Sequence, residues 1–358
     1  MTRLIRNSFT AHARRPSGWP MPTVLVAGLL AVQGCNWIGL AYGAATYREV
    51  RRGEAANVVA AGDRFYATRA EDGIAVIDAK TGVVRATIAT PSVDGSVDDL
   101  AVHGSLLFAL DARPPGSISV YDIANLDHPR LVSGPHPVAV GPFSGVSAAN
   151  GLCIVSGGTS SLTAWRFDST GTLTGPLAAA DLGRGQPDVT IAADGGSALV
   201  STHHWGPYFG VSRLRFDSKR SQLLESGTVP LDGAGFTSGG AKPANFPIVA
   251  TFVARNEALV AHGRGVTRIT IGPNHSLIRG RTIPVGGPAV SASSLNGTAA
   301  VAVGGDGPLV LLLAVEGDSV RVLRRISLPP GTIPGGVALG ASSVAIAARS
   351  QGVLVFMR

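Results

Sequence analysis

A short segment near the middle of the chain combines histidine with aromatic side chains. It reads HHWGPYF and contains His203, His204, Trp205 and Tyr208. Imidazole acts as a general base or a metal ligand near neutral pH, and aromatic faces stack on planar ligands. We predict that these residues form a lip that binds a planar, sugar-like or peptide ligand. The alternative is that Trp205 only anchors the loop to the protein.

A metal site is the second chemistry that these histidines could support. Such a site needs at least three ligands that converge on one point. Neighbouring side chains of an extended chain point to opposite sides. Only one of His203 and His204 could therefore join Asp188 or His262. We predict no bound metal.

Carboxylates gather in another segment, SVDGSVDD, which contains Asp94, Asp98 and Asp99. Their oxygens could hold a hard cation, but aspartate beside glycine is also typical of a turn. The chain has no G-x-S-x-G motif of the kind found in serine hydrolases. The run GGDG at 304–307 predicts a turn rather than a phosphate cradle, because no helical pattern follows it. The sequence predicts no catalytic set and no cofactor.

An internal repeat indicates which elements carry these segments. Each unit has an apolar strand, a turn at Gly or Asn, a second apolar strand, a loop and an alternating strand that usually ends at Asp. The first unit runs from Val58 to Asp78 and the second from Leu100 to Asp122. Amphipathic helical periodicity is absent. The 47 glycines and 23 prolines suit a chain that turns often.

The period of the repeat predicts the architecture. Turns at positions 62, 104, 151, 195, 256, 297 and 340 are 41 to 47 residues apart, except for one interval of 61. A period of about 40 to 45 residues with four short strands per unit is typical of β-propeller blades. The sequence therefore predicts an all-β fold, a seven-bladed β-propeller with four-stranded antiparallel blades, over residues 56–358.

The ends of the repeat region predict how the ring closes. The last unit lacks a fourth strand after Val353–Phe356, and an unassigned strand-like segment, Ala45–Val50, precedes the first unit. We expect this segment to complete the seventh blade, which would remove an exposed sheet edge. Residues 35–55 are therefore interpreted as a linker and closing strand.

Propeller geometry predicts one rim on which candidate binding residues meet. The loops between second and third strands and the loops between blades share one face around the central axis. The predicted ligand-binding residues on this rim are Arg69, Asp98, Asp99, Arg113, Asp188, His203, His204, Trp205, Tyr208 and Arg264. The loops are longest in the fourth and fifth units, and long loops on a rigid scaffold often carry binding sites.

Residues 1–34 have the composition of an export leader. They hold four arginines and no carboxylate, and the apolar run Val24–Val32 is too short for a bilayer, which needs about 20 residues. The following VQGC resembles a bacterial lipoprotein box, which implies a lipid on Cys35 and a membrane tether. A cleaved signal without lipid and an uncleaved anchor are the alternatives.

The net charge argues against one class of partner. The chain carries a formal charge of +7, of which the leader supplies four positive charges. The remaining +3 is spread over more than 300 residues that contain three lysines. Because nucleic-acid binding needs a basic patch, we predict no nucleic-acid partner.

Two stretches resemble known repeat families. Gly73–Pro91, GIAVIDAKTGVVRATIATP, resembles the YVTN repeat of bacterial surface and periplasmic propellers. Ser117–Val132, SISVYDIANLDHPRLV, is similar to the LVIVD repeat of a related family. The likeness covers about residues 56–358 and is strongest in the first two units. It implies a seven-bladed propeller, an exported location and mostly a binding or scaffold role, with no catalytic residues to carry over.

Two classes of function follow. We predict a noncatalytic binding or scaffold module, tethered to a membrane in the periplasm or at the cell surface, whose partner is an envelope protein or a small ligand. The alternative is a hydrolase of lactonase type, because propellers with YVTN-type repeats include lactonase relatives. An accessory subunit beside periplasmic redox proteins is a third possibility. A buried carboxylate paired with histidine on the axis would favour the enzyme, and exposed rim side chains would favour binding. The oligomeric state stays open.

Overall fold

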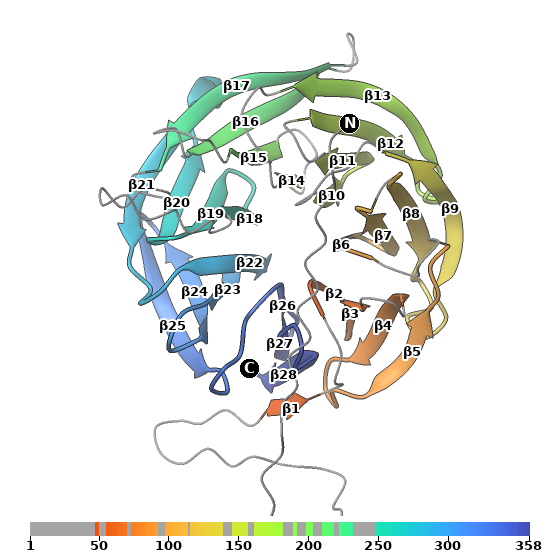
Figure 1. Ribbon diagram of the computed structural model, residues 1–358. Coiled ribbons are helices and arrows are strands. Elements are labelled where there is room, and N and C mark those ends of the chain that lie inside the picture. The colour runs from red at the N-terminus through yellow and green to blue at the C-terminus, as the bar shows by residue number, and fades with distance from the viewer. Residues whose placement is uncertain are drawn as a thin grey trace, which may run out of the picture. The chain divides into compact units, whose positions relative to one another are not determined.

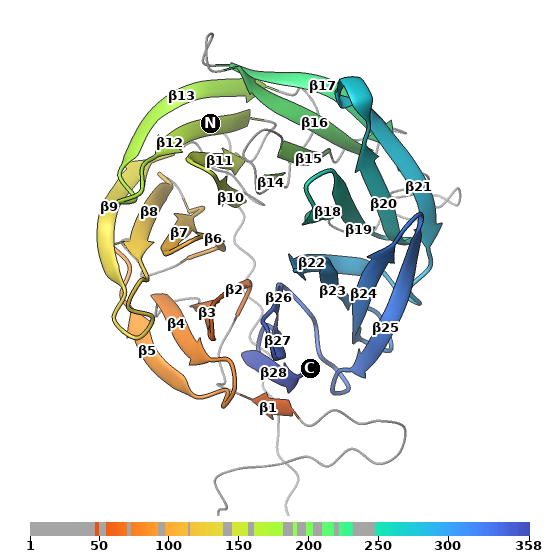
Figure 2. The same ribbon diagram turned by 180° about the vertical axis from the view of Figure 1, so that it is seen from behind.

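Seven four-stranded antiparallel sheets surround a central axis, as Figures 1 and 2 show from opposite sides. The computed structural model describes residues 47–49, 55–69, 73–91, 97–113, 115–138, 145–156, 161–181, 189–191, 198–202, 210–217, 222–231 and 248–358. The predicted seven-bladed β-propeller is confirmed. The described residues contain one short 3-10 turn, Pro273–His275, and no helix long and apolar enough to cross a membrane.

The first four blades follow the chain order from innermost to outermost strand. Blade 1 contains β2 (Val58–Ala61), β3 (Arg64–Arg69), β4 (Gly73–Asp78) and β5 (Val84–Ile88). Blade 2 contains β6 (Asp99–His103), β7 (Leu106–Asp111), β8 (Ser117–Asp122) and β9 (Arg130–Pro137). Blade 3 contains β10 (Val146–Ala149), β11 (Leu152–Ser156), β12 (Ser161–Phe167) and β13 (Leu173–Asp181). Blade 4 contains β14 (Val189–Ile191), β15 (Ala198–Thr202), β16 (Gly210–Asp217) and β17 (Gln222–Pro230).

The last three blades complete the ring. Blade 5 contains β18 (Val249–Ala254), β19 (Glu257–His262), β20 (Gly265–Ile271) and β21 (Leu277–Ile283). Blade 6 contains β22 (Ala289–Leu295), β23 (Thr298–Val303), β24 (Leu309–Glu316) and β25 (Ser319–Ser327). Blade 7 contains β26 (Val337–Leu339), β27 (Ser343–Ala347), β28 (Val353–Met357) and, as its outermost strand, β1 (Tyr47–Glu49).

The start of the described chain closes the ring, as predicted. β1 pairs antiparallel with β28, so that Tyr47 lies opposite Phe356 and Glu49 opposite Leu354. A second link lies on the same blade, where Ala55 and Arg349 exchange two backbone hydrogen bonds of 3.1 Å. The seventh sheet therefore contains strands from both ends of the propeller sequence.

The aspartates that end the third strands shape the hairpins that follow. Oδ1 of Asp78 accepts the N–H of Thr81 at 2.8 Å, and Oδ1 of Asp168 accepts the N–H of Thr170 at 2.9 Å. Asp122 caps the equivalent turn of blade 2 in the same way. A carboxylate that accepts from the backbone two or three residues later fixes a tight turn, which explains the repeated Asp.

The buried apolar side chains of the described residues form seven clusters, each between two neighbouring blades. Between blades 2 and 3, for example, the Phe108 and Phe167 rings lie 4.9 Å apart at a tilt of 60°. Cys153 in the same cluster is fully buried, as its apolar surroundings in the sequence predicted, and burial raises the pKa of its thiol. Because each blade is covered on both faces, the strands contain long runs of buried residues.

Candidate functional site

Loops of two kinds meet on one face of the propeller, as predicted for the rim. In blade 3, the N–H of Gly145, just before the innermost strand, donates to Ser156 Oγ at the end of the second strand at 2.6 Å. In blade 7, the N–H of Gly335 donates to the Ala347 carbonyl at 2.7 Å. In blade 2, Oδ2 of Asp98 accepts the N–H of Ala112 at 2.7 Å. In these three blades the bonds fasten the loop that precedes the innermost strand to the end of the second strand or the loop after it.

The predicted rim residues differ in their surroundings. Arg113 and Arg264 are exposed on the loops that follow the second strands of blades 2 and 5. Asp98 is exposed beside β6, and Arg69 is the half-buried last residue of β3. The other predicted residues lie outside the described residues: Asp188, His203, His204, Trp205, Tyr208 and the proposed lipidation site Cys35.

Asp99 is the first residue of β6 rather than a loop residue, and it joins three blades. Its Oδ2 accepts the N–H of Val146 in blade 3 at 2.7 Å. Its Oδ1 accepts the N–H of Leu100 in its own strand at 2.9 Å and the side-chain amide of Asn57 from blade 1. The carboxylate thus links the innermost strands of adjacent blades at the rim end of the axis.

The pKa of Asp99 reflects two opposing effects. Burial raises the pKa of this carboxyl to about 6, although hydrogen bonds from Val146, Leu100 and Asn57 favour the charged form. The partners that the structure gives the carboxylate are all amides, and no histidine is among them. This environment positions the side chain between blades and leaves little of it to meet a ligand.

Similar bonds continue around the inner ring. The N–H of Gly336 in blade 7 donates to the Ala56 carbonyl at 2.9 Å, and the N–H of Val337 donates to Ser291 Oγ of blade 6 at 3.1 Å. Asn57 was missed by the sequence analysis. An alignment of the repeats could have found it, because Asn57 and Asp99 both stand five residues before a turn glycine.

His262, considered as a rim ligand in the sequence analysis, is the buried last residue of β19. Its Nε2 lies 2.8 Å from Thr267 Oγ1, which lies 2.7 Å from Thr282 Oγ1. Burial lowers the pKa of His262 to about 4, and the positive charges of Arg279 and Arg264 add to this effect. The ring is therefore neutral near pH 7 and holds three strands of blade 5 together.

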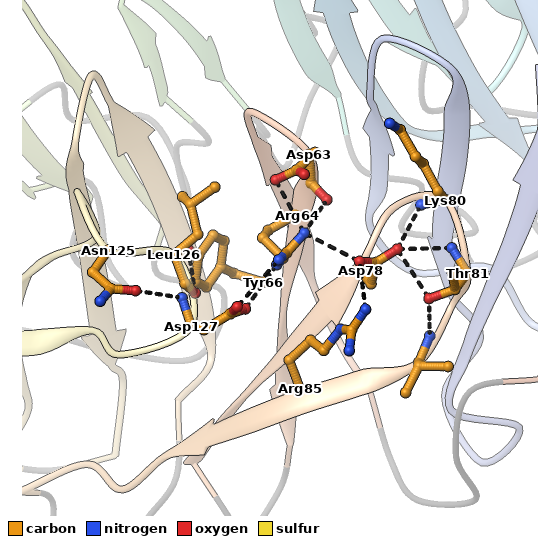
Figure 3. A network of polar contacts seen from close by, with 11 residues as sticks. Asp63, Arg64, Tyr66, Asp78, Lys80, Thr81, Arg85, Asn125, Leu126 and Asp127 are labelled. Atoms are coloured by element: carbon orange, nitrogen blue, oxygen red, sulfur yellow. Dashed lines mark hydrogen bonds and ion pairs between the residues drawn. The ribbon is translucent and has the colours of Figure 1, made fainter.

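A charged network lies on the opposite face, between blades 1 and 2 (Figure 3). Arg64 is nearly buried and contacts three carboxylates: Asp63 at 3.0 Å, Asp78 at 3.2 Å and Asp127 at 3.0 Å. Asp127 belongs to the hairpin between β8 and β9, so the network ties the two blades together. Burial opposes ionisation of Asp78, but hydrogen bonds from Thr81, Arg85 and Lys80 outweigh it and lower its pKa to about 2.

The same kind of link recurs in other blades. Arg213 of blade 4 donates to the His275 carbonyl of blade 5 at 3.3 Å. Arg268 of blade 5 pairs with Asp318 of blade 6 at 3.1 Å. In each case an arginine reaches the hairpin between the third and fourth strands of the next blade. The described residues contain no group of three or more His, Cys, Asp or Glu placed to hold a metal ion.

The fold and its loop face define the class of protein: a seven-bladed β-propeller with a charged rim. No model of a protein family matches the sequence, and a comparison with curated proteins finds no match.

Solved structures show the same fold at low sequence identity. The protein named U3-55K and the WD40 repeats of RRP9 each have a TM-score of 0.58 and 11% identity, over 86% of this chain and 96% and 95% of theirs. A computationally designed protein called Ika8 has a TM-score of 0.53 and 10% identity, over 85% of this chain and 83% of its own. At such identities the likeness establishes the propeller fold.

Proposed function

We propose that this chain is an exported, membrane-tethered propeller that acts as a noncatalytic binding or scaffold module through its rim. The observation that carries the proposal is that charged side chains stand exposed on rim loops of several blades, among them Arg113, Arg264 and Arg349. A closed ring of sheets holds these loops on a rigid base, which favours recognition of a partner.

The proposed export and tether come from the sequence. The leader of residues 1–34 ends at VQGC, and the repeats at Gly73–Pro91 and Ser117–Val132 resemble those of exported propellers. We also propose that this chain is a member of the related YVTN and LVIVD repeat families. The mass of the mature N-terminus tests the tether: a diacylglyceryl group on Cys35 supports it, whereas a mature chain that lacks both the lipid and the leader of residues 1–34 overturns it.

If the rim binds a partner, cross-links to that partner should form from positions on the rim face only. We would place a photo-reactive amino acid at Arg113 or Arg264 on the rim, and at Lys80 or His128 on the opposite face, in the native cell. A defined cross-linked product from the rim positions alone is the expected result. Cross-links from the opposite face alone would show that the binding surface has been misplaced.

The second candidate is a hydrolase of lactonase type, and one observation favours it. A carboxyl group with a pKa of about 6, that of Asp99, stands at the rim end of the axis, and such a group could act as a general base. Against this, its oxygens already accept hydrogen bonds from three amides. Hydrolysis of a panel of lactones by the purified chain, lost on Asp99→Asn, would establish the enzyme and overturn the binding proposal.

A further inference from the structure

Charge is unevenly distributed around the ring. Residues 55–138, which form blades 1 and 2, contain ten carboxylates and six basic residues, a net charge of −4. Residues 248–358, which form blades 5 to 7 without β1, contain ten arginines and four carboxylates, a net charge of +6. Blades 5 and 6 lie across the axis from blades 1 and 2 (Figures 1 and 2). The propeller therefore has an acidic side and a basic side.

Most carboxylates of the basic side are already paired with arginine. Arg268 contacts Glu257 and Asp318, and Arg321 contacts Glu316 at 2.6 Å. These contacts neutralise three of the four negative charges. The positive charge that remains belongs to the other arginines of these blades, several of which are exposed.

Two of these arginines face the same seam. Arg281 lies in a bulge of β21, where Gly280 and Arg281 together lie opposite Arg268, whose side chain reaches Asp318 of blade 6. Arg325 pairs with Leu311 of the apolar cluster between blades 5 and 6. Paired residues share a face of the sheet. The exposed Arg281 and Arg325 therefore flank one seam from the outermost strands of blades 5 and 6.

Large apolar side chains are exposed on the same strands. Ile278 on β21 is 52% exposed and Leu323 on β25 is 42% exposed. At the neighbouring seam, Arg324 of β25 donates to the carbonyl of Met357 on β28 at 3.2 Å, and the Met357 side chain is 47% exposed. We call Ile278, Arg281, Leu323 and Arg325 the basic seam. Guanidinium groups among exposed aliphatic side chains are the pattern that binds the interface of an anionic bilayer.

We propose that the basic seam rests on a membrane surface and contacts anionic phospholipid headgroups. Arginine suits phosphate oxygens because its planar fork can donate two parallel hydrogen bonds. The chain topology agrees, because β1 joins the ring at blade 7, next to blade 6, so a tether that precedes β1 would reach the propeller close to the basic side. In this respect the inference rests on the tether of the proposed function.

The test uses the full chain with Cys35→Ser, so that no lipid on the protein contributes. Its partition is measured on vesicles of phosphatidylcholine, alone or with about one third phosphatidylglycerol. We expect binding to the anionic vesicles only, with loss at about 0.5 M salt. Arg281→Glu with Arg325→Glu should weaken the partition coefficient at least about tenfold. Because lipidation of Cys35 is tested separately by mass, failure of the seam and failure of the tether are distinguishable.

A matched control separates the seam from total charge. Lys80→Glu with Arg130→Glu makes the same change in net charge at exposed positions of blades 1 and 2, and should leave the partition unchanged. Equal weakening by both pairs would overturn the inference. Binding of the chain to immobilised polyglutamate but not to anionic vesicles would also overturn it, since the seam would then recognise an acidic protein. Thermal melting of each variant tests whether it is still folded. The milder pair Arg281→Gln with Arg325→Gln removes the two charges without introducing carboxylates.

Discussion

The half-buried Asp99 and the buried His262 are titratable side chains whose pKa values burial shifts in opposite directions. The native pKa of Asp99 is raised to about 6, and that of His262 is lowered to about 4. Between about pH 4 and pH 6, native Asp99 keeps a proton that the unfolded chain has lost, so its contribution to the free energy of unfolding falls as pH rises. The unfolded chain binds a proton that native His262 does not, so the His262 contribution rises with pH. The two effects oppose each other in the same window.

We predict that single substitutions expose each slope. Relative to the parent chain, the melting temperature of Asp99→Asn should rise from pH 4.5 to pH 6. The corresponding difference in the free energy of unfolding should change by up to about 1.4 kcal/mol per pH unit. His262→Gln should show the opposite slope over the same range. Calorimetry at fixed ionic strength measures both. Parallel melting curves for all three proteins would mean that neither group is buried as the structure has it.

Arg64 tests whether the network between blades 1 and 2 stabilises the ring. Arg64→Met removes a guanidinium that is only 11% exposed, so that Asp127 loses this partner and Asp78 keeps only Arg85. We expect the free energy of unfolding to fall by about 2 kcal/mol. Arg130→Met is the control, because Arg130 is 77% exposed and lies 3.9 Å from Asp122. Such a surface pair contributes about 0 to 1 kcal/mol. Chemical denaturation that ranks the two variants equally would contradict this role.

At the level of the strands, glycine starts the third strand where the fourth strand passes closest. A Cβ on Gly73 would lie 2.1 Å from the Ile88 carbonyl oxygen, and a Cβ on Gly265 would lie 2.1 Å from that of Ile283. Gly210 in blade 4 is similarly close to Val229. In blades 1, 4 and 5 the fourth strand therefore lies where a side chain on the first residue of the third strand would begin.

Gly73→Ala separates this close approach from backbone strain. Gly73 has a φ of +82° and Gly297, in the turn between β22 and β23, has a φ of +76°, but a Cβ on Gly297 would meet nothing within 4 Å. Gly297→Ala should cost about 1 kcal/mol from backbone conformation alone. Gly73→Ala should cost about 2 to 4 kcal/mol because the carbonyl must also move. Equal losses in denaturant titrations would show that the clash relaxes freely.

For the complete ring, the pairing of β1 with β28 is the contact that closes the seventh blade. Each blade buries its faces against two neighbours, so an incomplete blade 7 would weaken the packing of blades 6 and 1 as well. We predict that deletion of residues 36–52 lowers the melting temperature by many degrees. Deletion of residues 36–46, which keeps β1, is the control and should melt like the parent chain. A melt that is the same for both deletions would refute closure by this strand.

Arginine side chains also connect neighbouring blades at several places around the ring. Arg64, Arg213, Arg268 and Arg324 each reach a carboxylate or carbonyl of the following blade. Arg213 and Arg268 hold the same position, the fourth residue of a third strand, whereas Arg64 lies on a second strand and Arg324 on a fourth strand. These links stabilise neighbouring pairs of blades, whereas β1 and β28 connect the two ends of the series.

The number of blades, the turns that lie within the described residues and the closing strand were readable from the amino-acid order. They depend on local features: alternating apolar residues, turn glycines and the aspartates that cap hairpins act within a few residues, so a period of about 40 to 45 is visible without coordinates. The partners of Asp99, the burial of His262 and the meeting of Arg281 with Arg325 at one seam were not readable. Those contacts join residues 40 or more positions apart or depend on strand register, and radial packing of the blades sets both. A repeat pattern predicts the blades, but which side chains meet between them depends on the angle and register at which neighbouring sheets pack.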